Sequence, residues 1–429
     1  MKRFAMDALK KWKMNEKRKP LLVLGARQVG KTWLMQNFGK ENYKKVAYVS
    51  FYNNHTMKDV FESDFDMERI LMSLSIETGV SITPNDTLII LDEIQDTPKV
   101  LESLKYFCEE AREYHVIAAG SLLGVTIHKG VSYPVGKVET LNLYPLSFRE
   151  FLFAMKQEQL ALALDTKDYI LIDGFAEKYL FWLKNYYYVG GMPEVVDAFS
   201  DNKDYTEVRK LQNQILNDYE NDFIKHIDKN LLPRVQMVWD SIPVQLAKEN
   251  KKFFFGQVKK GARSSDFELA IQWLQDAGLI QKVSRVNEPH IPLKSYKSLN
   301  SYKLFMIDIG LLSATSQLPV ESILKENDIF VEFKGALTEQ YVFQQIVSDT
   351  QYTPYYFGTE KATFEQDFMI QKGMQIIPIE VKATTNVYSK SLKAYCEKYK
   401  PEKAIRFSML KYQNQGWMEN IPLYAVCNL

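Results

Sequence analysis

The sequence has few cysteines, no excess charge of either sign and no long apolar run. Its three cysteines, Cys108, Cys396 and Cys427, lie far apart and form no Cys-x-x-Cys pair. This spacing argues against a zinc site and against a secreted disulfide scaffold, and it fits a reducing compartment. Lysine and arginine outnumber aspartate and glutamate by only 54 to 53. Any contact with nucleic acid must therefore come from a local basic patch.

No segment reaches the roughly 18 consecutive apolar residues that a membrane-spanning helix needs. The first segment, "MKRFAMDALKKWKMNEKRKP", also lacks the continuous apolar core of a signal peptide. We therefore expect a cytoplasmic protein without a membrane partner. The 429 residues, of which 46% are hydrophobic, are enough for several domains with filled cores.

Short apolar runs alternate with helix-length segments in the first third of the chain, which predicts a parallel α/β sheet covered on both faces. The next region is rich in helical patterns. It is followed by two helices, a Gly/Ser turn and a strand, which is the order of a winged helix. The last region predicts a helix, a hairpin and a second helix. The expected domains are an α/β core over 1–155, a helical region over 156–230, a winged-helix-like region over 231–319 and an α/β domain over 320–429.

The segment "GARQVGKT" matches the pattern Gly-x-x-x-x-Gly-Lys-Thr, directly after the apolar run "LLVL" and before a helical segment. Glycines permit the tight loop, and backbone N–H groups and the helix N-terminus then face a phosphate. Lys31 is expected to reach the β- and γ-phosphates, and Thr32 to ligate Mg²⁺. The predicted nucleotide-binding residues are Gly25, Ala26, Arg27, Gln28, Val29, Gly30, Lys31, Thr32 and Trp33.

The segment "LIILDEIQ" predicts a buried strand with Asp92 and Glu93 at its C-terminal end, where ligands bind in open α/β sheets. Asp92 is expected to hold Mg²⁺ through water, and Glu93 to orient and polarise the attacking water. Ser121, after the strand "VIAA", is the candidate γ-phosphate sensor. No Asn-Lys-x-Asp pattern for guanine occurs, so ATP with Mg²⁺ is the expected cofactor. Candidates for a charge-stabilising arginine are Arg27, Arg112 and Arg149.

Seven segments together resemble the AAA-superfamily ATPases of bacteria and archaea that carry a C-terminal domain related to PD-(D/E)XK nucleases. They are "RKPLLVLGARQVGKT", "LIILDEIQ", "AAGSLLG", "LNLYPLSFREFL", "YVGGMPEVV", "KLFMIDIGLL" and "IIPIEVKAT". The resemblance implies a P-loop ATPase core of AAA type, then a helical and winged-helix region, then a nuclease-like domain. Relatives commonly carry Gly-Arg where Gly136 and Lys137 stand here, and lysine does not reproduce the two-pronged contact of arginine with phosphate.

Nucleases of that kind need an acid on one strand, a Glu-x-Lys on the next and often a glutamate on the preceding helix. Here Asp367, then Glu380 with Lys382, and Glu339 stand in those places. The acids would bind Mg²⁺ and the lysine would position or activate water near the scissile phosphate. Asp367 can meet Glu380 across the hairpin if the register allows. The alternative is a retained fold whose charges form an internal ion-pair cluster.

Basic residues gather before and within the winged-helix-like region, at Lys251, Lys252, Lys259, Lys260 and Arg263. The candidate recognition helix, however, carries Asp266, Glu268 and Asp276, which phosphate would repel. We therefore expect that helix to pack, with the basic cluster as a solvated face or a phosphate contact. Asp308 is expected to cap the helix that follows it.

Two functions remain open at this point. The first is a Mg²⁺-dependent ATPase whose nucleotide state repositions a nuclease-like module acting on DNA or RNA. The second is a regulatory switch, in which ATP orders the core and a catalytically inactive nuclease-like domain binds a partner. The sequence leaves the oligomeric state open as well.

Overall fold

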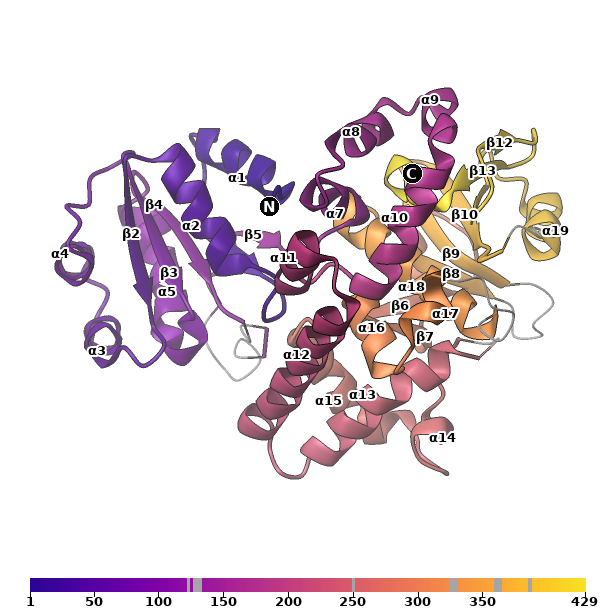
Figure 1. Ribbon diagram of the computed structural model, residues 1–429. Coiled ribbons are helices and arrows are strands. Elements are labelled where there is room, and N and C mark those ends of the chain that lie inside the picture. Colours follow the sequence, from indigo (N-terminus) through magenta and orange to yellow (C-terminus); the bar gives the residue numbers. More distant parts are fainter. Residues whose placement is uncertain (122–123, 126–132, 249–250, 325–330, 359–364, 385–387) are drawn as a thin grey trace. The chain divides into compact units, whose positions relative to one another are not determined.

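The computed structural model in Figure 1 describes most of the chain. The described residues are 1–121, 124–125, 133–248, 251–324, 331–358, 365–384 and 388–429. They form two compact units: the N-terminal unit, Lys2–Tyr144 with Asp276–Leu279, and the C-terminal unit, Pro145–Gln275 with Ile280–Leu429. Leu122 and Leu123 of "AAGSLLG", and residues 362–364 of the expected hairpin, lie outside the described residues.

The N-terminal unit is built on a five-stranded sheet in the order β2-β3-β4-β1-β5. All of its strand pairs are parallel. Every residue of β3 and β4 is buried, as expected for strands covered on both faces. The predicted parallel α/β sheet is therefore confirmed. The strands are β1 (Leu21–Leu24), β2 (Lys45–Ser50), β3 (Thr87–Asp92), β4 (His115–Ala119) and β5 (Glu139–Asn142).

Amphipathic helices cover this sheet and bury their apolar side chains against it. Leu9 and Trp12 are the buried residues of the first helix, and Phe107 of the last is fully buried. The helices are α1 (Ala5–Met14), α2 (Lys31–Asn42), α3 (His55–Ser63), α4 (Met67–Thr78), the short η1 (Ile94–Asp96) and α5 (Pro98–Glu110).

A buried histidine lies at the start of β4. The Tyr43 hydroxyl lies 2.6 Å from Nδ1 of His115, and Trp12 meets the same ring edge-on. Burial, together with the nearby charges of Arg18 and Lys13, lowers the pKa of His115 to about 4. The ring is therefore neutral at pH 7.

The C-terminal unit begins with helices and then adds one large sheet. Its helices are α7 (Phe148–Ala154), α8 (Glu158–Thr166), α9 (Tyr169–Gly174), α10 (Ala176–Val189), α11 (Pro193–Asn202), α12 (Tyr205–His226), α13 (Leu232–Leu246), α14 (Phe255–Val258), α15 (Ser264–Asp276), α16 (Ile309–Thr315), α17 (Val320–Leu324), α18 (Val331–Asp349) and α19 (Lys390–Tyr399), with 3₁₀ turns at Leu293–Tyr296 and Leu423–Asn428. The expected helical region 156–230 contains helices and no strand among the described residues.

The eight strands of this unit form a single sheet in the order β12-β13-β11-β10-β9-β8-β6-β7. They are β6 (Ile280–Val286), β7 (Lys297–Met306), β8 (Tyr355–Gly358), β9 (Glu365–Lys372), β10 (Gln375–Val381), β11 (Ile405–Ser408), β12 (Gln413–Asn414) and β13 (Glu419–Pro422).

The hairpin of β6 and β7 belongs to this sheet, because β6 pairs in parallel with β8 through Arg285 and Tyr356. The expected boundary between 231–319 and 320–429 therefore does not separate two sheets. The apolar pattern of a hairpin predicts its two strands, but it does not say which sheet takes its free edge.

Asp308 caps α16, as predicted, and also joins two further segments. Its Oδ1 accepts from Leu311 N at 3.1 Å, and its Oδ2 accepts from Gly191 N at 2.7 Å and from Gln344 Nε2 at 3.0 Å. A Cβ on Gly190 would lie 2.1 Å from Asp308 Oδ1, so the glycine permits this close approach. The segments "YVGGMPEVV" and "KLFMIDIGLL" thus meet in one buried polar contact.

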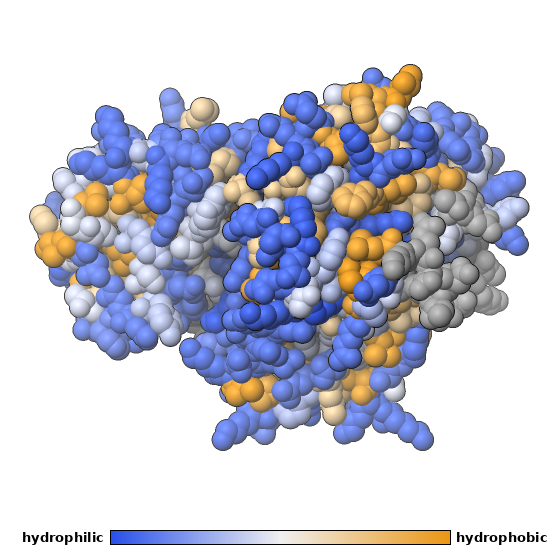
Figure 2. All heavy atoms as spheres, in the orientation of Figure 1, coloured by the Kyte–Doolittle hydropathy of each residue, from blue (hydrophilic) through white to orange (hydrophobic). Residues whose placement is uncertain are grey.

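Hydrophilic residues make up most of the face shown in Figure 2, and apolar residues occur there in small groups. Among the described residues, no helix is long and apolar enough to cross a membrane.

Candidate functional site

The predicted P-loop connects β1 to the N-terminus of α2. Gly30, at φ 91°, immediately precedes the helix, and Gln28 is also left-handed, at φ 65°. Gly25 lies where a Cβ would come within 2.3 Å of Leu143 O, and its φ of 150° is also unusual for a larger residue. The loop therefore has the tight, glycine-dependent shape that brings backbone N–H groups toward a phosphate.

Lys31 lies across this loop with 6% of its surface exposed. Its Nζ donates to Gly25 O at 2.9 Å and to Ala26 O at 2.7 Å. Burial lowers the pKa of Lys31 to about 8, while the carboxylates of Glu93 and Asp92 act in the opposite direction. The ammonium is thus positioned over the loop, where a phosphate would offer it a charged acceptor.

Asp92 ends β3 and is hydrogen-bonded to the start of α2. Thr32 Oγ1 donates to Asp92 Oδ2 at 2.6 Å, and the Tyr48 hydroxyl donates to the same oxygen at 3.2 Å. Burial raises the pKa of Asp92, and the hydrogen bond from Thr32 opposes that shift. Hydroxyl and carboxylate oxygens are the ligands that Mg²⁺ prefers, so this pair fits the predicted metal. Sequence reasoning missed Tyr48, because only the sheet order shows that β2, which carries Tyr48, lies beside β3, which ends at Asp92.

The strand order brings the other two predicted catalytic residues to the same edge. Because β4 lies between β1 and β3, Ser121 follows a strand that ends between the P-loop and Asp92. Ser121 is 8% exposed. Glu93 has a left-handed backbone, at φ 55°, and its Oε2 accepts from Gln95 Nε2 at 2.6 Å. Gln95 is a contact that the motif alone did not reveal.

The candidate arginines occupy different surroundings. Arg27 lies in the P-loop, whereas Arg112 donates to Cys108 O at 3.2 Å. Arg149 belongs to the C-terminal unit and pairs with Asp165. Lys137, the residue at which the sequence departs from the Gly-Arg common in the family it resembles, pairs with Glu109 at 2.7 Å.

Trp33, the last of the predicted nucleotide-binding residues, follows Thr32 in the first turn of α2. Its side chain is 44% exposed. An exposed aromatic ring beside a phosphate loop is available to contact a nucleotide.

The second predicted site lies on the sheet of the C-terminal unit. The antiparallel register of β9 and β10 pairs Ile379 with Phe368, so the next step of the same register sets Glu380 opposite Asp367. Val381 N donates to Asp367 Oδ2 at 2.7 Å, and Lys382 Nζ lies 2.8 Å from Glu380 Oε1. The structure therefore brings these three predicted side chains together.

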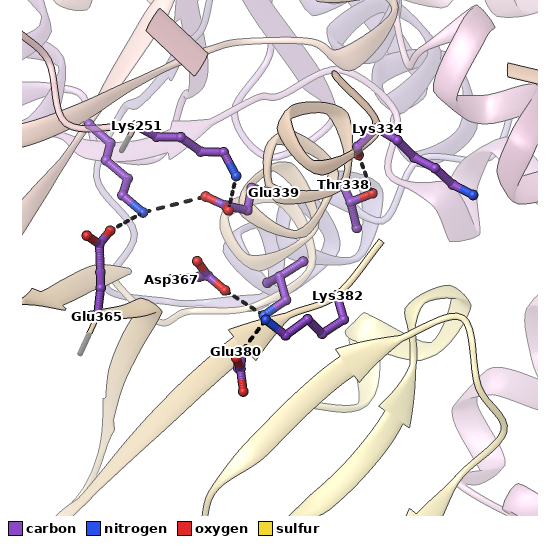
Figure 3. Close-up of polar contacts among 10 residues, drawn as sticks. Lys251, Lys334, Thr338, Glu339, Glu365, Asp367, Glu380 and Lys382 are labelled. Atoms are coloured by element: carbon purple, nitrogen blue, oxygen red, sulfur yellow. Dashed lines mark hydrogen bonds and ion pairs between the residues drawn. The ribbon is translucent and has the colours of Figure 1, made fainter. Parts of the chain in front are cut away.

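Glu339, on α18, joins the same cluster through a side-chain hydrogen bond with Asp367, and it also pairs with two lysines, of which Figure 3 labels Lys251. It pairs with Lys251, and its Oε2 lies 3.5 Å from Nζ of Lys303. Lys303 Nζ also lies 2.9 Å from Glu365 Oε1, and Lys303 is 1% exposed. Sequence reasoning missed Lys303, although a lysine inside the apolar run "YKLFMI" was a signal for it.

Burial and mutual charge effects together set the pKa values in this cluster. Burial opposes the ionisation of Glu339, but Lys251 and Lys303 outweigh it and lower the Glu339 pKa to about 2. Burial, followed by the negative charge of Glu339, raises the pKa of Asp367 to about 7. Lys251, once a candidate phosphate contact, is instead held by a buried carboxylate.

Two carboxylate oxygens of this cluster, Glu339 Oε2 and Glu380 Oε2, are buried without a hydrogen bond to the described residues, although Glu339 Oε2 has its ion pair with Lys303. Glu380 is 4% exposed, and its Oε2 is buried with no hydrogen bond to the described residues. The described part of the chain contains no group of three or more His, Cys, Asp or Glu side chains arranged to hold a metal ion. Asp367 and Glu380 therefore form a pair of acids, with Glu339 engaged by lysines.

The candidate recognition helix of the winged-helix-like region, α15, buries its apolar side. Phe267, Ala270, Ile271, Trp273 and Leu274 are its buried residues. Lys259, Lys260 and Arg263 are exposed just before it. The buried face accords with a packing role for α15, and the exposed basic residues remain a solvated face.

Three family matches cover most of the chain. Residues 17–152 match the AAA domain, residues 180–322 match a domain of unknown function, DUF8612, and residues 334–425 match another, DUF4143. No curated protein matches the sequence.

Solved structures also resemble the chain at low identity. A Walker-type ATPase of Pyrococcus abyssi is 15% identical, covers 72% of this chain and 94% of its own, and has a TM-score of 0.47. The Orc1 protein of Aeropyrum pernix, solved in complex with DNA, is 14% identical, with coverages of 75% and 92% and a TM-score of 0.27. The RuvB Holliday junction branch migration motor of Thermotoga maritima is 15% identical, with coverages of 70% and 89% and a TM-score of 0.32. The AAA-domain match over residues 17–152, which contains the P-loop, supports an AAA-superfamily ATPase core in the N-terminal unit.

Proposed function

We propose that the N-terminal unit binds ATP with Mg²⁺ and hydrolyses it. The bond of 2.6 Å between Thr32 Oγ1 and Asp92 Oδ2 carries this proposal. It joins the end of the P-loop to the end of β3, so the two oxygen donors expected at a Mg²⁺ site are already adjacent. Lys31 lies over the same loop, within reach of the phosphates that the loop would hold.

Each residue then has a separate task. The loop N–H groups and Lys31 bind the β- and γ-phosphates, and Thr32 and Asp92 hold the metal ion. When bound, Mg²⁺ neutralises charge on the phosphate oxygens. Glu93 orients a water in line with the γ-phosphate and accepts its proton, and Ser121 donates to the γ-phosphate from the end of β4. Trp33 contacts the nucleotide from the first turn of α2.

Nucleotide binding and its metal dependence test this assignment. We expect the purified protein to bind a fluorescent ATP analogue, with an affinity that Mg²⁺ increases. Lys31→Ala should weaken binding at least tenfold, and Asp92→Asn should abolish the effect of Mg²⁺. Lys44→Ala is the matched control, since Lys44 is exposed and pairs with Asp86 on the same unit. Equal binding by Lys31→Ala and Lys44→Ala would contradict the proposal.

A second activity is favoured by Oε2 of Glu380, which makes no hydrogen bond to the described residues. We propose that Asp367 and Glu380 bind a divalent cation and that Lys382 positions a water for cleavage of a phosphodiester in DNA or RNA. A buried carboxylate oxygen without a hydrogen bond is costly, and a cation would satisfy it. Two carboxylates suffice for Mg²⁺, which commonly keeps several waters and completes its shell with substrate phosphate.

Cleavage of single- and double-stranded DNA and RNA with Mg²⁺ or Mn²⁺, with and without ATP, tests this activity. We expect metal-dependent cleavage that Lys382→Ala abolishes. Lys403→Ala is the control, because Lys403 pairs with Glu419 at 3.1 Å in the same unit and lies outside the cluster. Cleavage that persists in Lys382→Ala would reject the role given to that lysine.

The competing function is a nucleotide-dependent switch with an inactive C-terminal binding module. The charges of the cluster favour it, because three lysines, Lys251, Lys303 and Lys382, already pair with its glutamates. In such a cluster the ion pairs balance the carboxylate charges without a metal ion. No cleavage by the wild type with either metal, combined with nucleotide binding by the N-terminal unit, would support the switch.

A further inference from the structure

We propose that Gln95 is a positioning residue that holds the Glu93 carboxylate for attack on ATP, and that Gly120 is required to leave room for it. This inference rests on the proposed ATPase activity. It gives a function to Gln95 and Gly120, which belong neither to the P-loop nor to the Asp92–Glu93 pair.

The first observation is the contact between the two side chains. Gln95 Nε2 donates to Glu93 Oε2 at 2.6 Å. An ionised carboxylate only accepts hydrogen bonds, so the amide nitrogen of Gln95 must face Glu93 and its carbonyl must face away. The orientation of the amide is thereby fixed.

The second observation is the backbone of Glu93. This residue has φ 55° and ψ 39°, a left-handed conformation that is uncommon for a side chain other than glycine. It turns the chain at the end of β3 directly into η1, and this turn lets Gln95 reach back to Glu93 two residues earlier. Such backbone conformations cluster at functional sites, where the surrounding structure maintains them.

The third observation is the fit between Gln95 and the end of β4. A Cβ at Gly120 would lie 2.5 Å from Gln95 Oε1, inside contact distance. The Gln95 carbonyl therefore occupies the space that any larger residue at 120 would need. The Gln95 amide therefore contacts Glu93 through its nitrogen, and its oxygen lies beside Gly120, the residue before the predicted γ-phosphate sensor Ser121.

These contacts predict how the reaction responds to substitution. Gln95→Met keeps the length of the side chain but removes the donor, so Glu93 loses its fixed orientation. We expect the turnover number to fall roughly tenfold or more, because misplacing a catalytic group by about 1 Å has effects of that size or larger. Nucleotide affinity should stay within about twofold of the wild type, since the hydrogen bond that Gln95 Nε2 donates within the described part of the chain goes to Glu93 and not to the P-loop.

Gly120→Ala provides a second route to the same effect. The one short contact given for the new methyl group is with the end of the flexible Gln95 side chain, and its other neighbours, at 3.5 and 3.6 Å, are at ordinary contact distance, so it should displace the Gln95 amide without unfolding the unit. We expect Gly120→Ala to reproduce the loss seen in Gln95→Met, and the double variant to lose no more than either single one. Asp96→Asn, at an exposed side chain of the same turn, is the control.

Steady-state ATP turnover and nucleotide affinity of the full chain, measured for these variants and in a Glu93→Gln background, form the test. In that background Gln95→Met should have no further effect, whereas a merely structural residue would add its own loss. Unchanged or increased turnover in Gln95→Met would overturn the proposal.

A structure of each protein separates this inference from the ATPase proposal. Absence of turnover by the wild type would reject the ATPase, and crystal structures of the wild type and Gly120→Ala would then decide the positioning. A Glu93 carboxylate that moves in Gly120→Ala supports it, and one that keeps its place overturns it.

Discussion

Replacing Asp308 with asparagine tests the buried contact that joins two motif segments of the C-terminal unit. Asp308 is fully buried, and four donors reach it: Gly191 N, Gly310 N, Leu311 N and Gln344 Nε2. Gln344 has little freedom to adapt, because its Oε1 accepts from Ile309 N at 2.8 Å. The arrangement therefore needs two acceptor oxygens at position 308.

The cost of Asp308→Asn follows from this geometry. The variant keeps its oxygen where Oδ2 receives two bonds, and its amide nitrogen then faces the Leu311 N–H. One buried hydrogen bond is lost and two donors oppose each other, which costs about 2 to 3 kcal/mol. A loss of that size lowers the melting temperature of a domain this large by roughly 5 to 10 °C.

Differential scanning calorimetry of the full chain at pH 7 measures this shift. Asp168→Asn is the matched control: Asp168 also caps a helix, through Ile170 N and Leu171 N, but its side chain is exposed. Asparagine caps about as well as aspartate, so the control should change stability by less than about 0.5 kcal/mol. A shift for Asp308→Asn no larger than that of the control would refute the reasoning.

Three further predictions concern single residues. Gly25→Ala should weaken ATP analogue binding at least roughly tenfold, because its Cβ would meet Leu143 O at 2.3 Å, and unchanged affinity would argue against a tight P-loop. His115 has a folded-state pKa of about 4 and an unfolded value near 6.5, so its neutral ring stabilises the fold above pH 6.5 and this contribution is lost as pH falls toward 4. Urea titrations should therefore show that the difference in unfolding free energy between wild type and His115→Gln shrinks as pH falls over that range, and a constant difference would contradict the prediction. Lys303→Met should lower the unfolding free energy by about 3 to 5 kcal/mol in the same titrations, because the negative charge of buried Glu339 then has one positive partner fewer. Lys403→Met, on a more exposed side chain, should lower it by under about 1 kcal/mol, and equal losses would show that Lys303 carries no buried charge pair.

Local patterns predicted the parts of the fold that depend on neighbouring residues. The run "LLVL", the glycine loop and the helix after it form β1, the P-loop and α2 because strand, turn and helix preferences act over a few residues. The N-cap role of Asp308 is similarly local. Its bonds to Gly191 and Gln344 are not, since they join residues more than thirty positions apart.

Pairings between distant segments could not be predicted. The place of β6 beside β8 depends on which sheet edge is free, and no residue pattern in the hairpin encodes that choice. The same limit explains why Tyr48 and Lys303 escaped notice, because each acquires its partner only when separate strands or helices meet. The sequence showed that Asp367 and Glu380 could lie opposite each other, but not whether the register of their hairpin would allow it, and the structure supplies that register.

Release of phosphate from ATP by the wild type and by Glu93→Gln, measured with Mg²⁺ under single-turnover conditions, tests the central claim most directly. Glu93 and Gln have the same length, so the variant should still bind ATP. We predict that the wild type releases phosphate and that Glu93→Gln binds ATP with similar affinity but releases it at least roughly a hundredfold more slowly. Equal rates in the two proteins, or no release by the wild type despite tight binding, would contradict the claim that this unit is an ATPase in which Glu93 activates the water.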